Sequence, residues 1–325
     1  MKKLICVMLT VLMTLSLFAG CGAAPADDGV INVAIVQQLD HSSLDEIRHA
    51  VEAELDKIAA EKGVKVEYKH FNGQNDTSIL SQIGTQVVSD GYDVIIPIAT
   101  LAAQYSVTAA EGTDIPIVYA AISDPVGAGL TGLPKVTGVS DALNTPFILD
   151  MMFAADPEIQ TVGLLYSLSE PNSTMPIAEA KAYLDAKGIS YIEKTGNTAD
   201  EVITAATALV GRVDAVFTPT DNAIMNVAPS VAEILNGAGI AHYTGADSFV
   251  QAGSFATCGV NYTELGTYAA GMAMDILLGG AVPEYHVMEG GIITVNADTA
   301  KALGLDYKVF ETMANTVQAV STIVD

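Results

Sequence analysis

The feature that most constrains the fold is an alternation of strand-like and helix-like segments along the chain. Short apolar runs such as VINVAIV at 30–36 and DVIIPI at 93–98 are separated by stretches with helical periodicity. In the stretch 44–62, apolar side chains recur on one face and charged ones on the other, and Gly63 follows as a stop signal. This alternation predicts a parallel sheet with helical crossovers. The expected strands are 30–36, 64–68, 93–98 and 115–120, and the expected helices are 44–62, 78–89 and 100–110.

The same order of elements then returns. The second set of expected strands is 161–166, 190–193, 214–218 and 240–243, and its helices are 175–187, 200–210 and 222–235. Landmarks recur as well: Gly63 and Gly188 each follow the first helix, and Asp93 and Asp214 each open the third strand. A repeat of this kind predicts an α/β protein of two similar Rossmann-like lobes, each with its own parallel sheet.

Three segments that fit neither period are predicted to cross between the lobes: 123–141, 248–261 and 286–292. The first lobe would then comprise 30–122 and about 262–285, and the second about 142–250 and about 291–325. A long helix is expected over 262–278, with Gly266 and Gly271 allowing close packing. Ligands of open α/β sheets bind beyond the carboxyl ends of the strands, so the arrangement predicts one cleft between the lobes.

The N-terminus carries an export signal. Two lysines precede a fifteen-residue apolar run that is too short for a comfortable membrane span, and small residues lead to Cys21. The Ala-Gly-Cys ending resembles a bacterial lipobox, which implies that residues 1–20 are removed, that Cys21 is lipidated and that 21–29 form a tether. An ordinary signal peptide followed by a chance cysteine is the alternative. Cys258 would then remain as the one other cysteine, interpreted as a buried small apolar residue.

Charge and motifs narrow the function. With 14 Lys+Arg against 38 Asp+Glu the formal charge is −24, which argues against nucleic acid and against docking on anionic lipid. The GAGLTG sequence at 127–132 matches a dinucleotide fingerprint, but Leu133-Pro134 follows instead of a helix, so a loop is expected. The five histidines show no metal-ligand spacing, and no nucleophilic triad can be argued. We therefore expect neither a metal, nor a cofactor, nor an enzyme.

Polar residues gather where the predicted strands end. Ser42 or Ser43 is expected to cap the helix after the first strand. The start of the helix 100–110, at Thr100, Leu101 and Ala102, offers amides and a hydroxyl for an anion. Similar polar stretches occur at 167–173, 219–222 and 245–248. A zwitterion fits such a cleft, with its ammonium on one of three acids, Asp221, Asp124 or Asp247.

Six stretches at these strand ends carry a resemblance to a known family: HSSLD at 41–45, TLAAQ at 100–104, SDPVGAGL at 123–130, TGVSD at 137–141, SEPNS at 169–173 and PTDN at 219–222. Together they resemble the substrate-binding lipoproteins of ABC transporters of the tryptophan/tyrosine type. The resemblance implies a type I periplasmic-binding fold that closes on its ligand, a permease with its ATPase as partners, and a place on the extracytoplasmic face of the membrane. This sequence differs from the family pattern at Ser42-Ser43, where the family often has Pro and a small residue.

By position in these motifs, the resemblance implies ligand contacts from His41, Thr100, Asn172, Ser173, Asp221 and Asn222, to which Asp124 and Asp247 are added as weaker candidates. It implies a small ligand, with an aromatic amino acid expected and a branched-chain one as an alternative. An aromatic wall would come from among Tyr105, Tyr119, Tyr166, Phe217, Tyr243 and Tyr262, most of which are expected to be core residues. We expect a monomer anchored only through lipid. A ligand-sensing lipoprotein and a cleft enzyme are the alternative functions.

Overall fold

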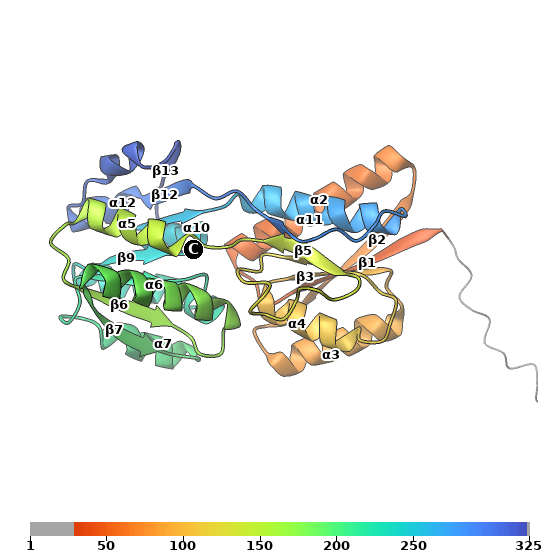
Figure 1. The fold of residues 1–325 in the computed structure, drawn as a ribbon, viewed down its shortest axis with the longest axis horizontal. Coiled ribbons are helices and arrows are strands. Elements are labelled where there is room, and N and C mark those ends of the chain that lie inside the picture. Colours follow the sequence, from red (N-terminus) through yellow and green to blue (C-terminus); the bar gives the residue numbers. More distant parts are fainter. Residues whose placement is uncertain (1–28, 324–325) are drawn as a thin grey trace, which may run out of the picture. The chain divides into compact units, whose positions relative to one another are not determined.

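The computed structural model describes residues 29–323. The predicted signal peptide 1–20, the lipid site Cys21 and all but the last residue of the tether 21–29 therefore lie outside the described residues. Residues from Ile31 onward form one compact unit that holds two sheets (Figure 1). Among the described residues no helix is long and apolar enough to cross a membrane.

The first sheet has the order β11-β5-β4-β3-β1-β2. Its strands are β1 (Val30–Gln37), β2 (Lys65–Asn72), β3 (Val94–Ile98), β4 (Ile117–Ala120), β5 (Val136–Ser140) and β11 (His286–Val287). The pairs that link β11, β5, β4, β3 and β1 are parallel, with registers such as Ile35 opposite Ile96. Its helices are α2 (Ser42–Lys62), α3 (Thr77–Asp90), α4 (Thr100–Ala109) and α11 (Tyr262–Leu277).

The first sheet is covered on both faces, which explains why its strands are apolar throughout. Along β1, Val33 and Ile35 face one core, and Ala34 and Val36 face the other. Helices α2 and α11 lie side by side over the first of these faces, and α3 and α4 over the second (Figure 1). Gly63 ends α2 with φ of 66°, as predicted, because glycine adopts the left-handed conformation readily.

The second sheet has the order β13-β12-β10-β9-β8-β6-β7. Its strands are β6 (Thr161–Tyr166), β7 (Ser190–Thr195), β8 (Ala215–Thr218), β9 (Ala241–Thr244), β10 (Ala256–Gly259), β12 (Ile292–Asn296) and β13 (Thr316–Val320). Its helical elements are α5 (Thr145–Ala155), η1 (Pro171–Ser173), α6 (Thr174–Lys187), α7 (Ala199–Thr207), α8 (Asn222–Met225), α9 (Ala228–Gly237), α10 (Asp247–Gln251), α12 (Ala297–Leu303) and η2 (Tyr307–Thr312). The order β7-β6-β8-β9-β10 repeats β2-β1-β3-β4-β5, so the predicted duplication is confirmed.

Three differences from the sequence prediction concern element boundaries. The predicted helix 222–235 is two helices, α8 and α9, because Pro229 begins a new helix and cannot donate within an old one. Strand β12 runs antiparallel to β10, although an all-parallel sheet was expected. Helix α5 and strand β13 were not anticipated. The remaining predicted strands and helices are present to within a few residues.

The segments that pass between the sheets are shorter than the predicted crossovers. The stretch 123–141 includes β5, 248–261 includes most of α10 and all of β10, and 286–292 includes β11. Within residues 29–323, the chain therefore passes from one lobe to the other at 141–144, 260–261 and 288–291. Strands β5 and β10 were missed because they are short and contain Gly, Thr and Ser, a composition that is typical of loops, and β11 was missed because it has only 2 residues. The GAGLTG stretch is a turn and loop, as expected.

Candidate functional site

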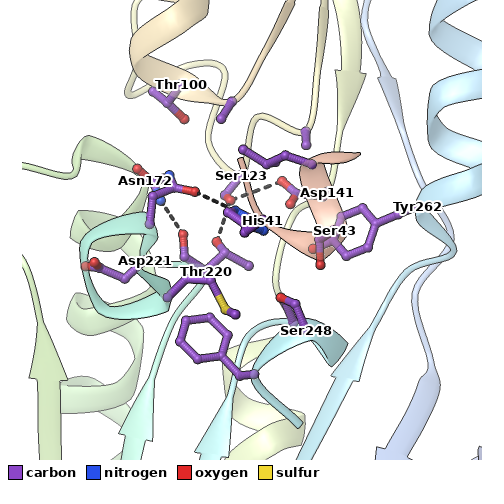
Figure 2. Close-up of a pocket in the computed structure, with 17 residues that line it drawn as sticks. His41, Ser43, Thr100, Ser123, Asp141, Asn172, Thr220, Asp221, Ser248 and Tyr262 are labelled. Atoms are coloured by element: carbon purple, nitrogen blue, oxygen red, sulfur yellow. Dashed lines mark hydrogen bonds between the residues drawn. The ribbon is translucent and has the colours of Figure 1, made fainter. Parts of the chain in front are cut away.

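The carboxyl ends of strands from both sheets meet around one cavity (Figure 2). It encloses about 400 Å³ including its opening to solvent. Its lining comprises His41, Ser43, Leu44, Ala99, Thr100, Ala121, Ser123, Asp141, Asn172, Thr220, Asp221, Asn222, Met225, Ala246, Ser248, Phe249 and Tyr262. Thr100 and Thr220 hold matching places, two residues beyond β3 and β8. The cavity thus lies where the fold predicts ligand binding, beyond the strand ends at the topological switch points.

Two of the lining residues are held in a strained backbone conformation. Ala99, directly after β3, has φ of 75°, and Ala121, directly after β4, has φ of 58°. Residues with a Cβ atom avoid this region at a cost of about 1–2 kcal/mol. Such strain concentrates at ligand sites, where it brings backbone and side chains close to the bound molecule. The two alanines therefore mark the edge of the first sheet that faces the cavity.

Among the described residues, four hydrogen bonds link side chains of opposite lobes in and beside the cavity. The Gln38 Nε2 amide donates to Glu170 Oε1 at 3.0 Å, and His41 Nε2 lies 3.2 Å from Asn222 Oδ1. The other two bonds link Ser43 Oγ to Asp247 Oδ1 at 3.3 Å, and Ser123 Oγ to Thr220 Oγ1 at 3.0 Å. Bonds between side chains of opposite lobes require the lobes to be near each other, so this structure is a closed one.

Asp141 is the acidic group best placed to meet a ligand. It follows β5, is 6 % exposed and lines the cavity. Ser123 Oγ donates to its Oδ1 at 3.1 Å, and the Tyr262 hydroxyl donates to the same carboxyl (Figure 2 shows both side chains). Burial raises the pKa of Asp141 to about 6 in spite of these donors. A cationic group beside it would remove that penalty, so the carboxyl favours a ligand ammonium.

Three polar atoms of the cavity wall are buried and have no partner within the protein: His41 Nδ1, Asn172 Oδ1 and Ser248 Oγ. Asn172 uses its amide nitrogen on the Thr220 carbonyl, which leaves its oxygen directed elsewhere. Burial lowers the pKa of His41, so its ring is neutral. Buried polar atoms cost free energy unless they are paired, so these three atoms indicate a polar ligand that supplies the missing partners.

The rest of the wall is apolar. Leu44, Met225, Phe249 and the Tyr262 ring line it together with three alanines. None of the lining residues is a lysine or arginine. A ligand carboxylate would therefore be held by hydroxyl and amide donors. Among the described residues, no group of three or more His, Cys, Asp or Glu side chains is arranged to hold a metal ion.

Five of the residues expected at the site line this cavity: His41, Thr100, Asn172, Asp221 and Asn222. Asp221 lies at its edge, but its carboxylate accepts from Ser167 N at 2.7 Å, Ser173 Oγ at 2.7 Å and Ile224 N at 3.0 Å. Its oxygens thus cap α8 and organise the second lobe. This geometry favours Asp141 over Asp221 as the partner of a ligand ammonium.

The other five expected residues do not belong to the lining. The Leu101 amide donates to Gln38 Oε1 at 3.1 Å, and Ala102 is part of the core between α4 and the sheet. Ser173 is buried, and its hydroxyl donates to Asp221. Asp124 accepts from the Gly127 amide at 2.8 Å within its own turn, and Asp247 accepts from Ser43. Ligand contact by these residues stays a prediction that the cavity geometry does not favour.

The helix cap predicted after the first strand is wrong. His41 is the N-cap residue of α2, and no side chain caps that helix. Ser43 lies inside the helix, where its hydroxyl is free to reach Asp247 in the other lobe. The cap position therefore holds the histidine at the end of β1, with its ring in the cavity wall.

Sequence reasoning assigned no site role to Asp141, Met225 and Phe249, and it included Thr220 and Ser248 only within the polar stretches 219–222 and 245–248. Asp141 and Thr220 lie within the motifs TGVSD and PTDN, so the signal was present but each motif was represented by other residues. Among the aromatic candidates, Tyr262 lines the cavity, whereas Tyr119, Phe217 and Tyr243 are fully buried core residues. Phe249 was hidden because its helix, α10, was taken as part of a crossover.

Comparison with known proteins agrees with this geometry. Residues 32–316 match the family model described as ABC transporter substrate binding protein. The chain is 32% identical over 281 residues to the tyrosine-binding protein of Clostridioides difficile strain R20291, a match that covers 84% of this chain and 81% of the relative. The chain belongs to the substrate-binding proteins of ABC transporters, which work outside the cytoplasm.

Two solved structures extend the comparison. The first is an ABC domain in complex with L-Trp from Streptococcus pneumonia, with a TM-score of 0.82, 29% identity and coverage of 89% and 99% of the two chains. The second is a ligand-free, open substrate binding protein with adhesive properties from Clostridium difficile, with a TM-score of 0.68, 30% identity and coverage of 90% and 100%. Although its identity to the L-Trp complex is no higher, the chain is nearer in shape to that complex than to the open structure, which agrees with the hydrogen bonds that join its lobes.

Proposed function

We propose that this protein binds an aromatic amino acid between its two lobes and delivers it to the permease of an ABC importer. The observation that carries the proposal is the closed cavity, which combines the buried carboxyl of Asp141 with an apolar wall around Phe249 and Met225. A zwitterion with a large apolar side chain satisfies both features.

Each part of such a ligand has a partner in the cavity. The ammonium lies against Asp141, whose carboxyl Ser123 and Tyr262 already orient. The carboxylate takes donors from the Thr100 hydroxyl at the N-terminus of α4 and from the Ser248 hydroxyl. The aromatic ring packs on the apolar wall, where burial of its surface contributes about 25 cal/mol per Å².

The relatives support the choice of ligand class. One is named as a tyrosine-binding protein and one was solved with L-Trp. Tyrosine and tryptophan both combine an α-amino acid with a ring that carries a hydrogen-bond donor. The unpartnered atoms His41 Nδ1 and Asn172 Oδ1 are well suited to such a donor.

The remaining expectations follow from the same function. We propose that the chain is exported, lipidated at Cys21 and held as a monomer on the extracytoplasmic face of the membrane, without catalysis. Two or more acyl chains suffice to anchor a folded body of this kind. Incorporation of a labelled fatty acid that is lost in a Cys21→Ser variant tests the anchor.

Calorimetric titration of the purified protein with each common amino acid tests the ligand. We expect L-tyrosine or L-tryptophan to bind and to raise the melting temperature, because a ligand that binds only the folded state stabilises it by mass action. Asp141→Asn should weaken binding by about 2–5 kcal/mol, the cost of leaving a buried charge unpaired.

Asp124→Asn and Asp247→Asn provide the comparison, because both acids were expected at the site from the sequence. If either of them abolishes binding while Asp141→Asn does not, the ammonium partner is assigned wrongly. If no amino acid binds at all, the proposed ligand class fails.

A further inference from the structure

A chain of hydrogen-bonded side chains crosses from one lobe to the other and ends in the cavity. Gln38 follows β1, and its Nε2 donates to Glu170 Oε1 at 3.0 Å. Asn222 Nδ2 donates to the second oxygen, Glu170 Oε2, at 2.8 Å, and Asn222 Oδ1 lies 3.2 Å from His41 Nε2. The four residues are buried or nearly so, with Gln38 fully and Glu170 98 % removed from solvent. His41, the last residue of the chain, lines the ligand cavity, and its Nδ1 is buried without a partner.

The orientation of the first amide in this chain is unambiguous. The backbone N–H of Leu101 donates to Gln38 Oε1 at 3.1 Å, and a backbone N–H can only donate. Gln38 Nε2 therefore faces Glu170, and Glu170 Oε1 must be an acceptor. Any proton on Glu170 is consequently confined to Oε2, the oxygen that meets Asn222.

Two states of the chain follow from the proton on Oε2. When Glu170 is ionised, Asn222 Nδ2 donates to it, Asn222 Oδ1 accepts from His41 Nε2–H, and His41 Nδ1 is a bare acceptor. When Glu170 is protonated, its O–H donates to Asn222 Oδ1 and the Asn222 amide turns over. Asn222 Nδ2 then donates to His41 Nε2, so the ring proton resides on Nδ1 and the cavity receives a donor.

We propose that Glu170 is a positioning residue which, through Asn222, sets the tautomer of His41 and so decides whether the cavity offers the ligand an acceptor or a donor at Nδ1. This inference rests on the proposed function, because the hydrogen-bonded chain joins the two closed lobes and its role is to present His41 to a ligand between them. It assigns to the SEPNS motif a role in recognition without contact with the ligand.

The surroundings make the proton on Glu170 accessible near neutral pH. Burial and the neighbouring carboxyl of Asp221 raise the pKa of Glu170 above its ordinary value, against the donors Gln38 and Asn222. Asp221 is the charged group that acts on it, and Asp45 and Asp40 act on the His41 ring. Because the acidic partner is protonated as pH falls, the donor state of His41 Nδ1 belongs to the lower pH.

A Glu170→Gln variant locks one of the two states. Its carbonyl oxygen must face Gln38 Nε2, so its NH2 group faces Asn222 and imitates the protonated acid. Nitrogen-15 NMR of histidine-labelled protein saturated with L-tyrosine reads which ring nitrogen of His41 carries the proton, with the signal assigned by a His41→Phe variant. We expect the wild type to change from Nδ1–H to Nε2–H as pH rises from 5 to 9, and Glu170→Gln to keep Nδ1–H throughout.

Calorimetry with L-tyrosine gives a second measurement. The affinities of wild type and Glu170→Gln should agree at pH 5 and differ by about tenfold or more at pH 9, since the variant cannot ionise at this position. Glu233→Gln, the same change on the exposed face of α9, should follow the wild-type profile.

The outcomes separate this inference from the proposed function. The proposed role of Glu170 is refuted if L-tyrosine binds but His41 keeps one tautomer at every pH. It is also refuted if the His41 tautomer changes with pH in Glu170→Gln as it does in the wild type. If L-tyrosine does not bind to the wild type, the ligand assignment fails instead.

Discussion

The two lobes share a strand order, but they cap the N-terminus of the helix after their third strand in different ways. In the second lobe, α8 carries its own cap: Asp221 accepts from Ile224 N at 3.0 Å. In the first lobe, α4 has no side-chain cap of its own, because Ala99 holds the cap position. Its Leu101 amide is satisfied instead by Gln38 Oε1, which comes from the end of β1.

This difference assigns unlike tasks to the lobes. The first lobe brings neutral groups to the closing surface, namely Gln38, His41 and the hydroxyl of Ser43. The second lobe brings two acids, the buried Glu170 and the half-buried Asp247, besides the neutral Asn222 and Thr220. Because an amide or hydroxyl can satisfy a buried carboxyl without a second charge, closure needs no ion pair between the lobes. A duplicated fold has thus acquired complementary rather than identical surfaces.

The largest expected effect comes from removing the cap of the second lobe. Asp221→Ala leaves Ser167 N, Ser173 Oγ and Ile224 N without their acceptor in a fully buried place. We expect the free energy of unfolding to fall by about 3 kcal/mol. Denaturant titration measures this. Asp221→Asn, which retains one oxygen, should cost less, and a cost equal to that of Asp221→Ala would mean that the retained oxygen contributes nothing.

Packing in the first lobe gives the next effect and a matched pair of variants. A Cβ added at Gly266 of α11 would lie 2.4 Å from the Ile47 carbonyl of α2, whereas at Gly271 it would meet nothing within 4 Å. The predicted close-packing role is therefore confirmed for Gly266 and wrong for Gly271. Gly266→Ala should lower the unfolding free energy by about 2 kcal/mol through overpacking.

Gly271→Ala should instead leave the free energy of unfolding unchanged or raise it slightly, because alanine favours the helix. Thermal unfolding of both variants measures the difference. Similar losses in the two variants would show that α11 does not depend on close contact with α2.

One source of acid sensitivity lies in the second lobe. His242 on β9 occupies the place of Val118 on β4, and it contacts Thr218 Oγ1 at 2.8 Å and Ser254 Oγ at 2.9 Å. Complete burial lowers its pKa to about 3. The unfolded chain then binds a proton at higher pH than the folded one, so stability is present above pH 6.5 and is lost as pH falls toward 3.

By pH 5.5 this loss amounts to about 1.4 kcal/mol, one pH unit below the ordinary histidine pKa. His242→Val, which copies the first lobe, should remove this part of the pH dependence even if it lowers stability at pH 7. Urea unfolding at pH 7 and pH 5.5 gives the comparison. An unchanged difference in the variant would place the acid sensitivity elsewhere.

Much of the fold could be predicted from the sequence because its strands are covered on both faces. Short apolar runs such as VIIPI are typical of a buried strand. Gly63 and Gly188 mark helix ends because glycine adopts the left-handed conformation that ends a helix. Strands β5 and β10 could not be predicted, since a strand of 5 or 4 residues that contains Gly, Thr or Ser has the composition of a loop. Strand β11 could not be predicted because it has only 2 residues. The identity of all three strands depends on pairing with strands far away in the sequence.

The site was predictable by location more than by role. Polar residues at strand ends correctly identified where a cavity would form, and His41, Thr100 and Asn172 line it. Which acid faces inward depends on long-range contacts: Asp221 is occupied by Ser167 and Ser173, and Asp141 is brought inward by Ser123. A local pattern favours a capping role for Asp221, which directly precedes an expected helix, but no local pattern shows that Asp141 faces the cavity.

The smallest effect tests the duplication itself. Asp93 accepts from Asn32 N at 2.7 Å at the start of β3, and Asp214 accepts from Gln160 N at 2.9 Å and Thr161 N at 2.8 Å at the start of β8. Each carboxylate ties the first strand of its lobe to the third. Because both side chains are exposed, Asp93→Ala and Asp214→Ala should each cost about 1 kcal/mol in unfolding free energy. Equal losses in chemical denaturation are expected from equivalent parts of a repeated fold. A loss of stability in one variant but not in the other would show that the two aspartates no longer have the same structural role. The lobes would then have diverged at the amino ends of their strands, as they have at the carboxyl ends.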